Sequence, residues 1–168
     1  VGPIEFRNCQ LRPFRNAIRA GALSIMSAYS DVDGEPSSGS RHLLTDVLRG
    51  ELGFKGFVVA DRGAIVLLKR HRLADDDAEA SARALKAGCD VDEGFLEFHT
   101  AGLTEALRRG LIDEGDLDVC AGRILYTKFV TGLFEHPFAQ SRPVEILRSA
   151  EHEAVALEAS RKAMTLLK

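Results

Sequence analysis

Apolar residues along the chain fall into segments that alternate between strand-like and helix-like spacing. Three short apolar runs are typical of strands buried in a parallel sheet, at residues 22–29, 56–60 and 89–92. Elsewhere the apolar positions recur at helical spacing, and several of these segments end at a glycine. The predicted helices cover residues 11–20, 41–52, 76–86, 101–109, 114–129 and 151–163. The pattern therefore predicts an α/β protein.

The spacing of the three predicted strands limits the number of α/β folds that fit. They start at residues 22, 56 and 89, close to the roughly 31 residues that each unit takes in a (β/α)8 barrel of about 250 residues. A doubly wound open sheet has a similar period. No glycine-rich phosphate loop follows any strand, which disfavours a nucleotide-binding open sheet. Three parallel strands would leave two apolar edges open, so we expect the chain to be part of a larger fold.

Charge and composition exclude several classes of protein. Acidic residues outnumber basic ones, 25 to 22, which argues against a protein that tracks nucleic-acid phosphates. No apolar run approaches the roughly 20 residues that span a bilayer. The first residues carry charges where a signal peptide needs an apolar stretch, and there is no N-glycosylation sequence. We expect neither nucleic acid nor membrane as a partner. The compartment stays open, with a soluble cytoplasmic protein favoured.

The cysteines and histidines give no sign of a metal site. The three cysteines, Cys9, Cys89 and Cys120, are an odd number without CxxC spacing, so we interpret them as buried or partly buried free thiols rather than disulfides or zinc ligands. None of the five histidines pairs with another at metal-binding spacing. The sequence therefore implies no metal.

Candidate chemistry lies at the predicted strand ends, because parallel α/β folds place reactive groups there. Asp61 directly follows a buried strand and is the sharpest candidate. An equally acceptable interpretation is a carboxylate that caps its own loop. Tyr29 ends the first strand, where a rim aromatic with a satisfied hydroxyl is the ordinary role. The group Asp90, Asp92 and Glu93 ends the third strand and could line a pocket.

Other acidic and basic clusters have ordinary structural explanations. The loop at residues 30–41 is rich in Asp, Gly, Pro and Ser and long enough to be functional. Asp31 and Asp33 lack the remaining ligands of a calcium loop, so a turn is expected there. Residues 75–77 are three aspartates before a predicted helix, where N-capping suffices. The basic run at residues 69–72 is too short to indicate nucleic-acid binding.

From Met26 to Asp61 the sequence becomes specific. Its motifs, in order, are a Met-x-x-Tyr element, a D-G-x-P loop, a Leu-Leu-x-x-x-Leu-Arg helix, G-F-x-G, and a strand ending in Ala-Asp: Met26 to Tyr29, Asp33 to Pro36, Leu43 to Arg49, Gly53 to Gly56, and Ala60-Asp61. This series resembles the catalytic-domain core of glycoside hydrolase family 3, in particular its bacterial β-glucosidases and β-xylosidases. Flanking segments extend the resemblance over nearly the whole chain.

The resemblance implies roles for four residues. Asp61 aligns with the catalytic nucleophile, which fits a retaining glycosidase because its nucleophile is a carboxylate held on a rigid element. Tyr29 aligns with the family tyrosine near the nucleophile, and Met26 with an apolar wall of the pocket. Many members have Trp or Tyr after the nucleophile, whereas this chain, which contains no Trp, has Arg62. Arg62 would bind substrate hydroxyls or pair with Asp61.

The resemblance also implies an incomplete (β/α)8 barrel, comprising about the last three β/α units. Residues 1–138 would be the C-terminal portion of the barrel domain, and residues 139–168 a linker and the first helix of a following α/β sandwich domain. The earlier barrel strands and that sandwich domain, both parts of the same parent chain, would be this segment's partners. The acid/base glutamate of the family commonly lies in the sandwich domain, so no residue of this chain is assigned to that role.

The implied activity is that of a longer enzyme. It would hydrolyse terminal non-reducing β-glucosidic or β-xylosidic bonds of an oligosaccharide or of an aryl or alkyl β-glycoside, by a retaining double displacement that needs no cofactor. The isolated 168 residues are expected to be inactive, because the barrel cannot close and the acid is missing. The alternative is a truncated or degenerate fragment without catalysis, with at most weak carbohydrate or partner binding. From the residues alone, an unrelated α/β small-molecule-binding domain also stays open.

Overall fold

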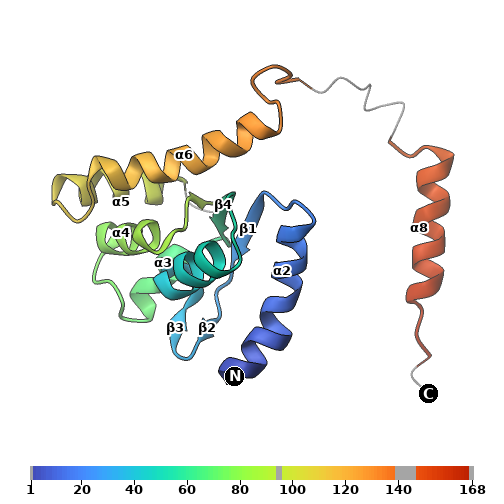
Figure 1. The fold of residues 1–168 in the computed structure, drawn as a ribbon, viewed down its shortest axis with the longest axis horizontal. Coiled ribbons are helices and arrows are strands. Elements are labelled where there is room, and N and C mark those ends of the chain that lie inside the picture. The colour runs from blue at the N-terminus through green and yellow to red at the C-terminus, as the bar shows by residue number, and fades with distance from the viewer. Residues whose placement is uncertain (1, 94–95, 139–146, 167–168) are drawn as a thin grey trace. The chain divides into compact units, whose positions relative to one another are not determined.

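The computed structural model describes residues 2–93, 96–138 and 147–166. It divides into two compact units, residues 1–131 and residues 132–168, and each is described by itself. The first unit is an α/β domain in which helices pack around a small parallel sheet (Figure 1). The parallel sheet confirms the α/β class predicted from the sequence.

The sheet consists of β1 (Ser24–Ser27), β4 (Phe57–Ala60) and β5 (Val91–Asp92), in that order and all parallel. Ser27 pairs with Ala60, and Ala60 pairs with Asp92, so the three strands reach their carboxyl ends at the same level. Gly56, just before β4, lies so close to β1 that a Cβ there would come 2.0 Å from the Leu23 carbonyl oxygen. Only glycine fits this approach, which accounts for the second glycine of the G-F-x-G motif.

Only one face of this sheet is fully covered. Val58 and Ala60 of β4 are completely buried, whereas Phe57 and Val59, which alternate with them, are only half-buried. Met26, which pairs with Val59, is 53% exposed. The prediction of a buried strand at residues 22–29 was therefore too long and only partly correct: β1 has four residues, lies at an edge of the described sheet, and fully buries only Ser27.

Helices surround the sheet and mostly match their predicted ranges. Besides the short helix η2, described below, those of the first unit are α1 (Pro3–Glu5), η1 (Phe6–Gln10), α2 (Leu11–Arg19), η3 (His42–Glu51), α3 (Ala64–Arg70), α4 (Asp77–Ala87), α5 (Leu96–Arg108) and α6 (Glu114–Val130). The chain runs helically from Pro3 through α2, which lies beside β1 (Figure 1). Cys9 is exposed on this stretch, so the prediction that all three thiols are at least partly buried was wrong for Cys9.

The main core lies between β4 and the helices η3, α3 and α4. Leu44 and Leu48 of η3, Val58 of β4, and Ile65 and Leu68 of α3 are buried there together. The alanine-rich face of α4 closes the cluster, because small side chains let the helix pack closely against α3 and η3. Helix α3 was not predicted, since its Ile-Val-Leu-Leu run has no polar face to reveal helical spacing.

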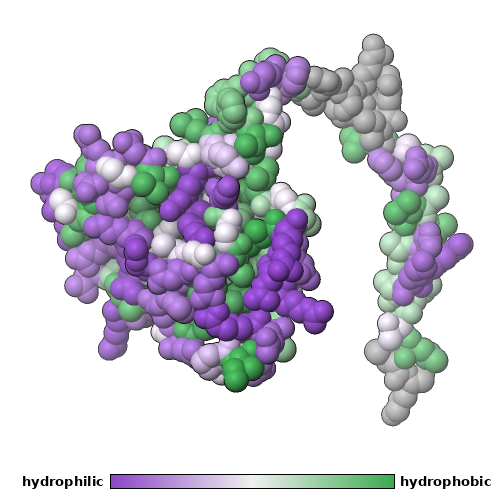
Figure 2. Space-filling model, in the orientation of Figure 1, coloured by the Kyte–Doolittle hydropathy of each residue, from purple (hydrophilic) through white to green (hydrophobic). Residues whose placement is uncertain are grey.

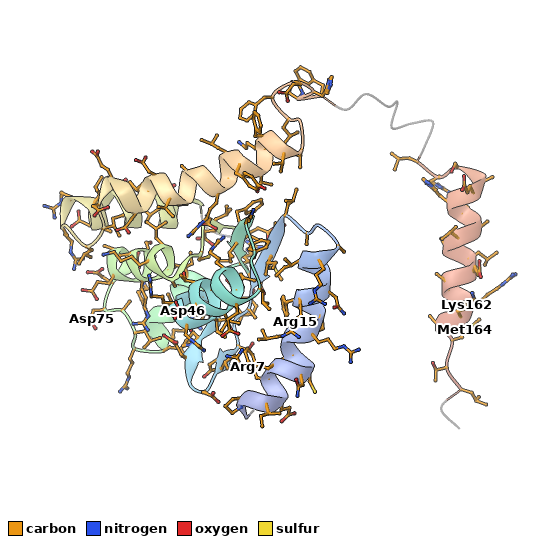
Figure 3. The ribbon with its side chains drawn as sticks, viewed as in Figure 1. Arg7, Arg15, Asp46, Asp75, Lys162 and Met164 are labelled. Carbon is orange, nitrogen blue, oxygen red and sulfur yellow. The ribbon has the colours of Figure 1, made fainter. Side chains whose placement is uncertain are left out.

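Helix α4 is capped as the sequence predicted. The Asp76 carboxylate accepts the Glu79 amide at 3.0 Å, and Gly88 ends the helix with a positive φ of 107°. A second cluster lies between α4 and α5 and contains Ala82 and Ile112. On the surface, Arg7 of η1 forms an ion pair with Glu51 of η3. Figure 3 labels Arg7, and it labels Asp46 on the same helix as Glu51.

The loop after β1 contains a small antiparallel hairpin. Strands β2 (Asp31–Val32) and β3 (Glu35–Pro36) are joined by Asp33 and Gly34, which have positive φ angles of 52° and 85°. An Asp-Gly pair suits such a turn because both residues tolerate this conformation. The turn expected at this position is confirmed. The short helix η2 (Ser37–Gly39) then leads into η3.

The second unit is described mainly by helix α8 (Ala150–Ala163), whose first turn is capped by the Ser149 hydroxyl. Its side chains are exposed throughout, and Figure 2 shows hydrophobic and hydrophilic residues mixed along it. Residues 139–146, which open the expected linker, lie outside the described residues. In the part of the chain that is described, no helix combines the length and the apolar character needed to cross a membrane.

Candidate active site

Asp61 lies one residue beyond the carboxyl end of the central strand β4. Its amide donates to the Ser27 carbonyl at 3.1 Å, so the pairing between β1 and β4 continues to the backbone of Asp61 itself. Ala60, directly before it, is completely buried, while Asp61 is half-buried. The fold thus presents this carboxylate at the rim of the sheet, on a backbone that the sheet holds in place.

The Asp61 carboxylate is not used to cap a helix. Helix α3 begins after Gly63, and its N-cap has no side-chain hydrogen bond. The Asp61 carboxylate accepts the amide of the next residue, Arg62, at 2.7 Å. This local bond is the loop-capping role considered from the sequence, and it orients one carboxylate oxygen. It also holds the Arg62 backbone beside Asp61.

Tyr29 approaches Asp61 from the neighbouring strand end. Its hydroxyl donates to the Arg62 carbonyl at 2.8 Å, so the rim aromatic has a satisfied hydroxyl. The pKa of Tyr29 is raised above its ordinary value, first by partial removal from water and then by the Asp61 carboxylate, while Arg62 opposes the shift. The phenol therefore stays neutral, and able to donate, beside a carboxylate.

Three of the four predicted site residues therefore lie together. Asp61, Tyr29 and Arg62 share one rim of the sheet, and the Arg62 residue is exposed. Met26 lines a hollow of about 420 Å³ beside β1, with Leu11, Phe14 and Leu48 among the other walls. Neither Asp61 nor Tyr29 lines this hollow.

A hydroxyl network that sequence analysis missed supports the Tyr29 loop. The hydroxyls of Ser27 and Ser38 are 2.8 Å apart and buried, and Ser37 donates to the Ser30 carbonyl at 2.7 Å. Glu35 accepts from Ser40 at 2.6 Å and from Arg83 of α4 at 3.0 Å. The loop after Tyr29 is thus tied to β1 and α4. The three closely spaced serines, Ser37, Ser38 and Ser40, were the signal in the sequence.

Asp90 does not line a pocket. Its side chain is fully buried and accepts three hydrogen bonds: Arg49 and the Val58 amide bind one oxygen at 2.7 and 2.8 Å, and Arg123 binds the other at 2.8 Å. Asp92 is also buried, and Glu93 is exposed. The pocket-lining role considered for this group is wrong for Asp90, because strand β5 begins only at Val91 and Asp90 lies before it.

Among the residues with described positions, no three His, Cys, Asp or Glu side chains are grouped so as to hold a metal ion. Tyr29 and Arg62 are titratable groups that lie near Asp61. The chemistry that this rim can offer is that of an oriented carboxylate with a phenol and a guanidinium beside it.

Comparison with known proteins gives a consistent picture. The family model described as the glycosyl hydrolase family 3 N-terminal domain matches residues 2–126. The periplasmic β-glucosidase of Salmonella typhimurium is 34% identical over 96% of the chain, and β-D-xylosidase 1 of Arabidopsis thaliana is 32% identical over 93%. The chain spans only about a fifth of each relative, 22% and 20% of their lengths.

Solved structures agree. A β-glucosidase from Erythrobacter marinus superposes with a TM-score of 0.88 and 36% identity, over all of this chain and 22% of that one. A β-glucosidase from Listeria innocua in complex with glucose gives a TM-score of 0.87 and 30% identity, over 95% of this chain and 22% of that one. A mutant of the Listeria protein was solved in complex with laminaribiose. The α/β fold with its parallel sheet is therefore that of these β-glucosidase structures.

Proposed function

The chain belongs to glycosyl hydrolase family 3, and from this membership we propose that it is part of a longer enzyme that hydrolyses terminal β-glucosides or β-xylosides. The observation that carries the proposal is Asp61, a half-buried carboxylate at the carboxyl end of the central strand, with Tyr29 beside it. The two relatives are named a β-glucosidase and a β-D-xylosidase, and the Listeria β-glucosidase structures contain glucose and laminaribiose. These names and ligands indicate a carbohydrate substrate.

The proposed reaction is a retaining double displacement. The Asp61 carboxylate attacks the anomeric carbon, the bond to the aglycone oxygen breaks, and an acid supplies the aglycone with a proton. The resulting glycosyl ester on Asp61 is then attacked by water, which loses a proton to the same acid/base group and regenerates the carboxylate. The second carboxyl must lie roughly 5–5.5 Å from the nucleophile, and it is supplied from outside this segment.

The neighbours of Asp61 have distinct proposed tasks. Tyr29 stays neutral and holds the backbone of Arg62, whose amide donates to Asp61, so the phenol steadies the nucleophile through the backbone of one residue. Arg62 binds substrate hydroxyls where many members have an aromatic platform. Met26 forms an apolar wall. We expect Arg62→Trp in the full-length protein to change the ratio of kcat/KM for glucosides and xylosides; an unchanged ratio would remove Arg62 from substrate recognition.

The sheet supports an incomplete (β/α)8 barrel as the architecture. Its strands follow chain order, β1, β4, β5, as in a barrel that grows in one direction. The half-open face that carries Met26 and Val59 would become barrel interior once earlier strands pair with β1. We further propose that residues 1–138 complete the barrel and that residues 139–168 lead into a sandwich domain. A fragment of these 168 residues alone should be inactive, since it lacks the acid.

Trapping of the nucleophile tests the function directly. The full-length protein is treated with a 2-deoxy-2-fluoro-β-glucoside or xyloside, which forms the glycosyl ester but hydrolyses slowly, and peptides are mapped by mass spectrometry. We expect one added sugar on the peptide that contains Asp61. Asp92→Asn serves as a matched control, because it removes a strand-end carboxylate of the adjacent strand. Labelling on another residue, or turnover without any labelling of Asp61, would contradict the assignment.

A further inference from the structure

The buried cluster around Asp90 extends to the strand that carries Asp61. We propose that Asp90, held by Arg49 and Arg123, is a positioning residue that fixes the start of β4 and thereby the place of Asp61 at its other end. The inference rests on the proposed function for its kinetic readout. Its structural part is independent of that function.

Asp90 binds both backbone polar groups of one residue of β4, Val58. The Asp90 amide donates to the Val58 carbonyl at 2.8 Å, and the Asp90 carboxylate accepts the Val58 amide at 2.8 Å. Both polar groups of Val58 thus depend on a single residue of the segment before β5. Since the Val58 side chain is itself completely buried, this part of the strand has little freedom to shift.

Arg49 and Arg123 hold that carboxylate from two other elements. Arg49 of η3 also donates to the carbonyls of Gly56 and Gly88, at 2.8 and 3.2 Å. It therefore links the segments that lead into β4 and β5. Its guanidinium carbon lies 5.5 Å from the centre of the Phe54 ring. Arg123 of α6 binds the second carboxylate oxygen. The two side chains are only 12% and 21% exposed, which shields these ion pairs from water.

The effect reaches Asp61 because β4 is short. The strand has four residues, Asp90 holds its second, and Asp61 follows its last. On the opposite edge, β1 pairs along β4 up to the Asp61 amide. A catalytic group must be held within about 0.5 Å of its productive position. A strand that shifts by about 1 Å at one end can lower the rate by about 10²-fold.

A cluster that only stabilises the fold makes a different prediction. Its loss would lower the melting temperature and leave kcat of the folded protein unchanged, whereas loss of positioning lowers kcat with little change in KM. The two readouts therefore separate the two roles.

The test compares variants of the full-length protein. Asp90→Asn keeps an acceptor for the Val58 amide but loses the charge, and Arg123→Lys loses the shape of the guanidinium. Ile112→Ala, in the core between α4 and α5, is the control, since it destabilises without touching β4. We expect kcat on 4-nitrophenyl β-glucoside or xyloside to fall by about 10-fold or more in Asp90→Asn, with KM within about threefold. Ile112→Ala should keep kcat despite a lower melting temperature.

A second readout does not depend on activity. Amide hydrogen exchange should increase in the peptide covering residues 57–61 in Asp90→Asn and Arg123→Lys, but not in Ile112→Ala. Unchanged exchange there, or a kcat no lower than in Ile112→Ala at equal thermal stability, would overturn the positioning role. Absence of turnover and of Asp61 labelling in the unmodified protein would instead refute the proposed function, and the exchange measurement would still decide this inference.

Discussion

Asp61 and Asp90 are acidic residues at opposite ends of β4. Asp61 follows the last residue of the strand, and Asp90 binds Val58 near its start. Asp90 is completely buried, and three donors converge on it from η3, β4 and α6. Asp61 is half-buried at the rim and accepts the amide of its own neighbour. In parallel α/β folds the carboxyl ends of strands carry chemistry and the amino ends carry stability.

The difference shows what burial does to a carboxylate. Ionised oxygen atoms inside a protein need several donors to replace water, so Asp90 is fully occupied by the fold. Asp61 keeps capacity for a substrate because the sheet holds its backbone rather than its side chain. Substitution of each residue should therefore affect a different property.

The largest effect is expected on catalysis at Asp61. Asp61→Asn in the full-length protein keeps the shape but removes the nucleophile, so kcat should fall by about 10³-fold or more, equivalent to at least about 4 kcal/mol in the activation barrier. The free energy of unfolding should change little. Steady-state kinetics with an aryl β-glycoside and a denaturant titration measure both. Activity near that of the unmodified protein would mean that Asp61 is not the nucleophile.

The reverse pattern is expected at Asp90. Asp90→Ala leaves two guanidinium groups in a poorly solvated site without their carboxylate, which should lower the free energy of unfolding by about 3–5 kcal/mol. Chemical denaturation followed by circular dichroism measures this loss, with Asp61→Ala as the rim control. If both alanine variants lost the same stability, the contrast between rim and interior would not hold.

A smaller effect on the free energy of unfolding is expected from substitutions of the two arginines, and it should differ between them. Arg49→Lys loses contacts to two backbone carbonyls as well as to Asp90, whereas Arg123 contacts Asp90. A lysine keeps the charge but not the fork of donors. We therefore expect Arg49→Lys to cost about 1.5–3 kcal/mol in unfolding free energy, and Arg123→Lys less. Equal or inverted losses would show that the backbone contacts of Arg49 contribute little.

The subtlest effect concerns the ionisation of Tyr29. Because its pKa is raised in the folded protein, the stability linked to its neutral form is complete below its ordinary pKa of about 10 and is lost as the pH rises through the folded value. Asp61→Asn removes one cause of the shift, so Tyr29 should ionise at lower pH in that variant. Absorbance near 295 nm follows the titration, and Tyr29→Phe corrects for the other tyrosines. Identical Tyr29 titration curves in the unmodified protein and in Asp61→Asn would show that Asp61 does not influence the pKa of Tyr29.

The sequence predicted the elements whose pattern is local. The β4 strand with Asp61 at its end, the caps of α4 and the turn at Asp33 all depend on neighbouring residues, and each lies where it was expected. Helix α3 was missed because its apolar run shows no period. The exposure of β1 was missed because apolar content does not say whether a neighbouring strand is present.

The role of Asp90 was beyond a local interpretation. Its partners Arg49, Val58 and Arg123 lie far from it in the sequence, and only the crossovers of the fold bring them together. The local sequence around an aspartate beside a predicted strand does not show whether its side chain faces solvent or is buried against two arginines. The serine contacts beneath the Tyr29 loop depend on the fold in the same way.

The cluster around Asp90 also has a consequence for the time course of folding. It joins residues from η3, β4 and α6, so it can form only after several long loops have closed. A nascent chain on the ribosome must release α6 before Arg123 can reach the carboxylate. The β1–β4 pairing and the η3–α3–α4 core lie entirely before α6 in the chain, so they can assemble before Arg123 is available. The strand that carries Asp61 would then be built first and brought to its final position in a late step.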